Sequence, residues 1–208
     1  MIASVLKLSR MDSKALRIID GYSLHRVIYG LFDDIRSEDE KRASVPSGFL
    51  FADKGGDDEG RLIFLLSDRE PKMPEHGSLQ SKIVPDSYLY HDCYRFEVII
   101  NPTRRESASR KLVAIRRSDE ISTWFTAKAP VSWGFSVNPE SLDIRLLPAK
   151  QFSKKGHQLT LGGAVISGNF RVKDRPLFIN SFKNGIGRGR AFGFGLLQIA
   201  PLISSINS

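Results

Sequence analysis

The chain has 208 residues, enough for one large domain or two small ones with a buried core, and its hydrophobic share of 41% argues against an intrinsically disordered protein. Its single cysteine excludes an internal disulfide and a cysteine-based zinc site. Its first residues lack the apolar segment of a signal peptide, and no apolar run approaches the roughly 20 residues of a membrane helix. We therefore expect a cytoplasmic protein without membrane contact. The net charge is +8, and residues 150–208 carry all of it, with nine basic residues against one acid. This distribution predicts a polyanionic partner, RNA or DNA. A basic surface that only makes the protein more soluble is the alternative.

Hydrophobic spacing predicts the elements of the first half. Apolar side chains from Leu24 to Ile35 recur with a period near 3.6, which predicts a helix over residues 21–36 with one buried stripe. Asp20 directly before it is expected to be its N-cap. In chain order we expect a strand over 2–9, this helix, a solvated acidic loop at 37–42, a hairpin of 48–52 and 61–67, a long proline-containing connection with a short helix over 69–90, and a strand over 94–100.

This order is that of a ferredoxin-like or RNA-recognition-motif domain, and a second, similar set follows it. Residues 103–115 either extend the strand before them or link outward. We therefore predict an α+β fold of two tandem ferredoxin-like domains, residues 1–117 and 118–208. The second set consists of a helix over 119–129 with Ile121, Trp124 and Phe125 as its buried face, strands over 141–152 and 157–172, a short helix over 174–184 and a closing strand over 194–200.

Four side chains share one flank of the helix over 21–36, next to its apolar stripe: Tyr22, His25, Arg26 and Tyr29. Histidine titrates near neutral pH and can transfer a proton, while a guanidinium or phenol can stabilise developing negative charge. Because RNA carries its own 2′-hydroxyl nucleophile, these groups suffice to cut a phosphodiester without a metal. An ordinary amphipathic helix with a surface histidine and packing tyrosines is the alternative interpretation.

A glycine-rich segment near the end of the chain interleaves glycine with arginine and phenylalanine. Glycines let a backbone approach a phosphate closely, and arginines and phenylalanines add charge and stacking faces for RNA. A dinucleotide-binding fingerprint fails on context, because no acid follows Asp174. A structural turn with phenylalanines in the core is the alternative. The residues expected to contact RNA are Gly185, Gly187, Arg188, Arg190, Gly193 and Gly195, with Phe192 and Phe194 as stacking faces.

A basic hairpin is predicted between the last two long strands. Its tip is cationic and can enter a groove of duplex RNA, where it would contact phosphates and 2′-hydroxyls. A solvated loop is an equally weighted alternative, and the basic run over 103–117 is similarly ambiguous. The hairpin residues expected to bind RNA are Lys150, Lys154, Lys155 and His157.

Several of these segments together resemble one known family. The C-terminal GIGRGRAFGFGLLQIAPL is similar, nearly position for position, to the glycine-rich loop and closing strand of the CRISPR-associated endoribonuclease CasE of type I-E Cascade, within the RAMP superfamily. The segment RFEVIINPTRR resembles the family's Arg-Phe-x-x-x-x-Asn-Pro segment, residues 119–124 resemble the start of its second-domain helix, and YSLH resembles its Tyr-x-x-His.

The resemblance implies two tandem ferredoxin-like domains and a metal-independent endoribonuclease that needs no cofactor. It implies cleavage of the repeat hairpin of precursor CRISPR RNA at the 3′ base of the stem, with a 2′,3′-cyclic phosphate on the product. The protein would then stay on that product beside the backbone and Cas5-type subunits of Cascade. By the resemblance, His25 is the catalytic histidine and Tyr22 its partner.

One position departs from the family pattern. Some members carry Lys or His five positions after the catalytic histidine, where this chain has Gly30. Charge stabilisation would then come from another group such as Arg26, or catalysis would be slower. A catalytically silent RNA-binding subunit of a CRISPR complex is therefore one alternative, and an unrelated basic protein-interaction module is another.

Overall fold

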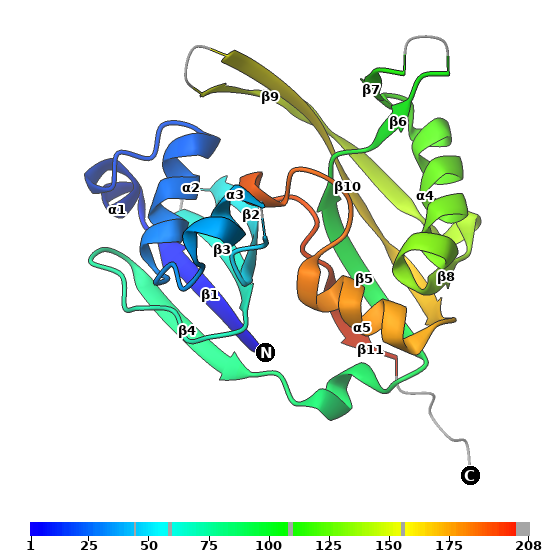
Figure 1. Ribbon diagram of the computed structural model, residues 1–208, viewed down its shortest axis with the longest axis horizontal. Helices are drawn as coiled ribbons and strands as arrows, with labels where there is room; N and C mark the ends of the chain where they lie inside the picture. The colour runs from blue at the N-terminus through cyan, green and yellow to red at the C-terminus, as the bar shows by residue number, and fades with distance from the viewer. Residues whose placement is uncertain (44, 58–59, 108–109, 155–156, 203–208) are drawn as a thin grey trace.

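Two antiparallel sheets, each with helices on one face, stand side by side in the computed structural model of the protein (Figure 1). The structure describes residues 1–43, 45–57, 60–107, 110–154 and 157–202. For residues 150–154 and 157–160 it describes the strand backbone without side chains. The predicted α+β fold class is confirmed, because each sheet has the strand order of a ferredoxin-like domain. None of the described helices is long and apolar enough to span a membrane.

The first sheet has the order β2-β3-β1-β4, and all neighbouring strands are antiparallel. Within the described residues 68–77, between β3 and β4, the chain forms no helix, so this unit lacks the second helix of the full motif. The elements of the first unit are β1 (Ile2–Leu8), α1 (Arg10–Ala15), α2 (Gly21–Gly30), α3 (Glu38–Arg42), β2 (Phe49–Asp57), β3 (Gly60–Ser67) and β4 (Ser78–Ile83).

Alternation along β1 decides which face of the first sheet meets α2. Leu6 and Leu8 are at most 1% exposed and belong to a core cluster that also contains Leu24 and Ile28 of α2. Because side chains alternate along a strand and recur every three to four residues along a helix, one apolar face of each is buried against the other. This packing sets the position of α2 on the sheet.

The second sheet has the order β11-β5-β10-β8, and β9 pairs with the N-terminal part of β10. The β8 and β9 strands together occupy the place of a single second strand, so the topology is again ferredoxin-like. The elements are η1 (Asp86–Leu89) in the connection, then β5 (Cys93–Ile100), β6 (Thr103–Arg105), β7 (Leu112–Ala114), α4 (Ser118–Trp133), β8 (Phe135–Val137), η2 (Pro139–Ser141), β9 (Asp143–Lys154), β10 (His157–Val172), α5 (Arg175–Asn184), η3 (Arg190–Phe192) and β11 (Gln198–Pro201).

The two units share one hydrophobic core. Leu50, Ala52 and Leu66 from the first sheet belong to the same buried cluster as Ile100 of β5 and the helices of the second unit. At the edge of this contact, Lys54 of β2 forms an ion pair with Glu97 of β5. The units therefore pack on each other instead of being joined only by a linker.

The strand over 94–100 was expected to close the first sheet, and this assignment is wrong. It forms β5 in the second sheet, paired with β10 and β11. The first sheet is closed by Ser78–Ile83, a mostly exposed strand of polar composition that lacks an apolar strand signature and was assigned to a connection. We therefore infer that the boundary between the units lies between Ile83 and Cys93 instead of near residue 117.

Two further expectations need correction, and one that the sequence left open is decided by the structure. The helix predicted over 21–36 ends at Gly30, and Ile35, which was placed on its buried stripe, is 69% exposed. The acidic stretch expected to be a loop forms α3, because Ser37 and Glu40 make a reciprocal capping box. Residues 103–115 link outward, since β6 and β7 form a separate small hairpin.

We predict that Tyr94→Phe lowers the free energy of unfolding by about 1 kcal/mol at neutral pH. Tyr94 is fully buried, donates its hydroxyl hydrogen to the Tyr88 carbonyl at 2.7 Å and accepts from the His91 N–H at 3.2 Å. Burial raises the pKa of Tyr94, so the unfolded chain loses this proton first. The contribution of Tyr94 to the free energy of unfolding is therefore fully present below about pH 10 and is lost as the pH rises above that value.

Urea unfolding across pH measures both effects. The Tyr94→Phe protein should lose less stability above pH 10 than the parent, because it lacks one of the groups that titrate. Tyr90→Phe is the matched control, since Tyr90 is 65% exposed, and it should leave the stability at neutral pH unchanged. Equal stability of Tyr94→Phe and Tyr90→Phe would contradict the prediction.

Candidate functional site

The helix α2 begins with a tight N-terminal cap. Asp20 Oδ1 accepts a hydrogen bond from the Ser23 N–H at 2.7 Å, and Ser23 Oγ accepts one from the Asp20 N–H at 2.9 Å. The Ser23 N–H and then its hydroxyl hold the pKa of Asp20 below its usual value, with a smaller contribution from the charge of Arg26. The cap fixes the first turn, which carries Tyr22, in a single geometry.

His25 lies in the middle of α2, half-buried among aromatic rings. Its ring centroid is 4.1 Å from that of Tyr29, 6.2 Å from that of Tyr22 in a nearly parallel stack, and 6.0 Å from that of Phe192. The Nδ1 atom of His25 is shielded from solvent. A half-buried imidazole of this kind can take part in proton transfer to or from a bound substrate.

The two tyrosines beside His25 have different surroundings. The Tyr29 hydroxyl donates to Ser47 Oγ at 3.3 Å, and its ring meets Phe49 edge to face at 4.7 Å. Tyr29 therefore anchors the helix to β2 and the segment before it. Tyr22 is half-buried and packs against the core cluster shared by both units. The predicted pairing of Tyr22 with His25 on one flank of the helix is present in the structure.

The glycine-rich segment is held against both units. The Gly195 N–H donates to the Ile99 carbonyl at 2.7 Å, the Ile186 N–H donates to the Gly195 carbonyl at 2.9 Å, and Arg188 forms a β-bridge with Asn101. The short helix η3 in this segment contacts both α2 and β2 (Figure 1). This placement brings Phe192 next to His25.

At Gly193 the backbone and the packing both exclude a side chain. Gly193 has φ +83°, and a Cβ atom there would lie 2.8 Å from the Phe51 ring of β2. The close approach expected of these glycines is thus made in part to protein, at the contact between the two units.

The arginines and phenylalanines of the segment divide between surface and core. Arg188 is exposed, as expected for a residue that contacts RNA. Arg190 is exposed too, but its Nη1 donates to the Asn184 carbonyl at 2.8 Å and so closes the end of α5. Phe194 is 3% exposed, so the expectation that it offers a stacking face is wrong; it fills the core cluster.

The basic hairpin extends over the helix that carries His25. The strand β9 contacts α2, and Figure 1 shows the hairpin of β9 and β10 arching above that helix. Lys155 lies outside the described residues, and the side chains of Lys150, Lys154 and His157 do as well. The backbone alone therefore brings this basic segment to the site.

These elements together place a half-buried imidazole near exposed cationic groups of its own helix and of the glycine-rich segment. Arg26 is exposed on the same helix, and Arg188 is exposed on the glycine-rich segment. The arrangement suits proton transfer on an anionic ester bound from solvent. Among the described residues, no cluster of three or more His, Cys, Asp or Glu side chains could hold a metal ion.

The sequence did not reveal one contact of His25 and one contact of its neighbour Tyr29. Phe192 was expected to stack on RNA, yet its ring lies beside His25, and Ser47 was not singled out although it accepts from Tyr29. Both lie far from His25 in the sequence and in other elements, so helix periodicity carries no signal for them.

Comparison with known proteins identifies relatives of this architecture. The model of a family described as "CRISPR associated protein" matches residues 3–201. The CRISPR-associated endoribonuclease Cse3 of Thermus thermophilus is 25% identical over 118 residues, which cover 51% of this chain and 55% of that protein. The match therefore spans about half the length of that curated relative.

Solved structures share the fold over nearly the whole chain. Thermus thermophilus Cse3, bound to an RNA that represents a pre-cleavage complex, has a TM-score of 0.75 at 19% identity and covers 96% of this chain and 98% of its own. The CRISPR-associated protein Cas6e of Escherichia coli K-12 has a TM-score of 0.71 at 22% identity, with coverage of 97% and 100%. A chain of a pre-nicking CRISPR RNA-guided surveillance complex has a TM-score of 0.72 at 20% identity, with the same coverage. At these identities the likeness establishes the fold.

We predict that Gly193→Ala destabilises the protein by about 2 kcal/mol, because a side chain in the left-handed conformation is strained and its Cβ would meet Phe51. Gly30→Ala is the matched control: no atom lies within 4 Å of a Cβ at Gly30, and alanine favours the helix by about 0.5 kcal/mol. Urea unfolding should order the proteins as Gly30→Ala, parent, Gly193→Ala. Parent-like stability of Gly193→Ala would show that the segment does not pack tightly on β2.

Proposed function

The chain belongs to the family of CRISPR-associated proteins, and on that premise we propose that it is a metal-independent endoribonuclease that cleaves the repeat hairpin of precursor CRISPR RNA. The observation that carries the proposal is the environment of His25. The imidazole is half-buried, phenol rings flank it, and the glycine-rich segment and the basic hairpin both contact the same helix.

The proposed reaction uses a nucleophile that the RNA itself supplies. The 2′-oxygen forms a bond to the adjacent phosphorus while the bond from phosphorus to the 5′-oxygen breaks. The products are a 2′,3′-cyclic phosphate and a 5′-hydroxyl end. A base must accept the 2′-hydroxyl proton, and an acid must deliver a proton to the leaving oxygen. His25 is assigned one of these proton transfers, and Tyr22 is its partner.

Negative charge on the phosphorane needs a cationic or hydrogen-bonding neighbour. Arg26, exposed one residue after His25, is the group on this helix that can supply it. The remaining contacts to the RNA backbone are assigned to the exposed Arg188, to the glycine-rich segment and to the basic hairpin. Arg188, the glycine-rich segment and the basic hairpin all lie in the part of the chain that carries the net positive charge, and this supports the assignment.

We further propose that the protein stays on its product as a subunit of Cascade, beside the backbone and Cas5-type proteins, in the cytoplasm. A strongly basic surface that binds a structured RNA through many phosphates favours retention, because each contact slows dissociation. The single cysteine is compatible with a reducing compartment.

A second candidate function is a catalytically silent subunit that binds the same hairpin. Gly30 favours it, since this position holds no basic side chain in a chain that otherwise resembles the cleaving family. The presence of both His25 and Tyr22 on one helix flank favours the nuclease. Gel analysis of the bound RNA separates the two candidates.

We predict that His25→Ala reduces the single-turnover cleavage rate by about 10² to 10⁴-fold, because it removes a positioned acid or base. Binding of the hairpin should stay within a few-fold of the parent value, since His25 is half-buried and neighbouring cationic groups remain. Tyr22→Phe should cost less, because the histidine is retained. A folded His25→Ala protein that cuts at the parent rate would exclude His25 from the reaction.

Two controls on the RNA and the medium test the same mechanism. A single 2′-deoxy substitution immediately 5′ of the scissile phosphate should abolish cleavage and leave binding intact, because it removes the nucleophile and little else. Cleavage by the parent should persist in excess EDTA. Loss of activity in EDTA, restored by a divalent cation, would overturn the metal-independent mechanism.

We predict that Gly30→Lys increases the cleavage rate by up to about tenfold, because it adds a cation one helical turn after Arg26. The space around a Cβ at Gly30 is open within 4 Å, so the longer side chain fits without displacing the helix. Gly30→Ala is the control for helix stability and should cut at the parent rate. Equal rates for Gly30→Lys and Gly30→Ala would show that charge at this position does not reach the reacting phosphate.

A further inference from the structure

One ring beside His25 has no part in the proposed reaction as described so far. It belongs to Tyr29, whose centroid lies 4.1 Å from that of the imidazole, with the two ring planes tilted by 35°. The rings of Tyr22 and Phe192 are more distant, at 6.2 and 6.0 Å between centroids. Residues four apart on a helix are neighbours on its surface, so His25 and Tyr29 meet within α2 itself. Of these three rings, Tyr29 limits the movement of the imidazole most closely.

Several contacts fix the ring of Tyr29 in turn. It meets Phe49 of β2 edge to face at 4.7 Å between centroids, and Phe49 stacks on Phe32 at 4.3 Å. Both are favoured arrangements of aromatic pairs. The Tyr29 hydroxyl donates to Ser47 Oγ at 3.3 Å. The rings form a continuous series of contacts, which we call the aromatic column; its members, in order, are His25, Tyr29, Phe49 and Phe32.

Arg69 holds the end of the aromatic column that is farthest from His25. Its guanidinium carbon lies 5.5 Å from the centroid of the Phe32 ring, a distance at which a cation is attracted to the face of an aromatic ring. Arg69 Nη2 donates to the Asp33 carbonyl at 2.8 Å and to the Ser47 carbonyl at 3.0 Å. One side chain from the connection after β3 therefore ties the segment after α2 to the segment before β2, and with them the last ring of the column.

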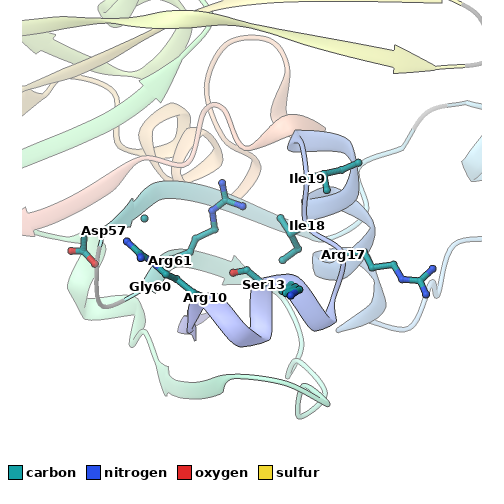
Figure 2. Close-up of a pocket in the computed structure, with 10 residues that line it drawn as sticks. Arg10, Ser13, Arg17, Ile18, Ile19, Asp57, Gly60 and Arg61 are labelled. Carbon is teal, nitrogen blue, oxygen red and sulfur yellow. The ribbon is translucent and has the colours of Figure 1, made fainter.

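The backbone of α2 is fixed separately, at its beginning. Ile18, in the segment that leads from α1 into α2, packs against the core cluster under the helix (Figure 2). The N–H groups of Ile19 and Asp20 both donate to Ser23 Oγ, at 3.0 and 2.9 Å. The Cα atom of His25 therefore has a defined position. The helix does not set the rotation of the imidazole about its Cβ–Cγ bond, because the minima of that torsion are broad.

This rotation matters for a proton transfer. A general acid or base acts within about 3 Å of the atom that it protonates or deprotonates, and a misplacement of about 1 Å can lower a rate by about 10²-fold. Because the phenol ring of Tyr29 lies partly face to face with the imidazole, a turn of the imidazole would drive its edge into that ring. The contact with Tyr29 therefore restricts the one torsion that the helix leaves open.

We propose that Tyr29 is a positioning residue for the cleavage reaction: its ring orients the imidazole of His25, and the rest of the aromatic column, held by Arg69, orients the ring of Tyr29. The inference rests on the proposed function, because Tyr29 acts on the reaction only through His25. The ring carries this role, since the hydroxyl is bonded to Ser47. Loss of the ring should therefore change the cleavage rate and leave the affinity for the hairpin unchanged.

The first test is single-turnover cleavage of the repeat hairpin by two variants of the same residue. Tyr29→Leu removes the ring and should lower the rate by about 10- to 10²-fold, while Kd stays close to the parent value. Leucine favours a helix, so α2 should persist. Tyr29→Phe keeps the ring and should restore most of the rate. A structural role of Tyr29 that is confined to folding would change the melting temperature and leave the rate of the folded protein at the parent value.

Ile28→Val is the matched control for destabilisation of the helix. Ile28 precedes Tyr29 on α2 and is fully buried in the core under the helix. Its replacement removes one buried methyl group and should lower the melting temperature without changing any ring of the aromatic column. The cleavage rate should equal that of the parent. A loss as large as that of Tyr29→Leu would assign the effect to loosening of α2 and would overturn the inference.

Phe49→Leu tests the aromatic column one ring farther from His25, in a variant that leaves α2 unaltered. It should lower the rate less than Tyr29→Leu, again without a change in Kd. Because both residues act through the same imidazole, the double variant should cut no more slowly than Tyr29→Leu alone. A parent rate for Phe49→Leu, or a double loss equal to the product of the single losses, would contradict the role of the column.

A second measurement follows the imidazole without RNA. Nuclear Overhauser contacts between the ring protons of His25 and those of Tyr22 and Phe192 report where the imidazole lies, and His25→Ala identifies its signals among the four histidines. Tyr29→Leu should weaken these contacts, because the imidazole can then turn away. Tyr29→Phe and Ile28→Val should retain them. Unchanged contacts in Tyr29→Leu would show that Tyr29 does not orient His25.

The outcomes separate this inference from the proposed function. If the parent cuts the hairpin and Tyr29→Leu cuts equally fast, or if Tyr29→Phe is as slow as Tyr29→Leu, the ring of Tyr29 has no positioning role and the nuclease proposal stands. If the parent binds the hairpin without cutting it, the proposed function fails, and the assignment of Tyr29 to the reaction fails with it.

Discussion

The contact between the glycine-rich segment and the two sheets is the constraint on which the rest of the structure depends. Gly193 lies against Phe51 of the first sheet, and the Gly195 N–H is bonded to Ile99 of the second. A short helix between these units then holds Phe192 against His25. Because His25 and Phe192 come from different units, the environment of the imidazole exists only while both units pack on this segment.

The same contact explains why a largely neutral unit and a basic unit can form one site. The first unit supplies the helix with His25 and Tyr22, and the second supplies most of the net positive charge. Neither is sufficient for the proposed RNA cleavage: a polyanion must be concentrated at the surface, and a proton must be moved at one phosphate. The shared core, which includes Leu50 and Ile100, holds the helix with His25 and the basic unit in a fixed position relative to each other.

Where sequence and structure disagree, burial is the reason. The strand over 78–83 is mostly exposed at a sheet edge, so it lacks the apolar pattern that marks a buried strand. Because the sequence did not predict this strand, the strand over 94–100 was assigned to the first sheet in its place. Phe194 stands in a run of glycines and arginines that suggests a solvent-facing loop, yet its ring fills the core. Ile35 continues a helical spacing, but the helix ends at Gly30 and Ile35 is exposed.

By itself, the sequence determined the features that depend on short-range spacing. The cap at Asp20, the placement of Tyr22 and His25 on one flank of a helix, the two sets of ferredoxin-like elements and the basic C-terminal half all follow from local patterns. Only the tertiary structure decided which sheet the strand β5 joins, that Phe192 is a neighbour of His25, and that the glycines face protein as well as solvent. These are contacts between residues far apart in the chain. They depend on how complementary surfaces pack in three dimensions, and periodicity along the sequence does not encode that.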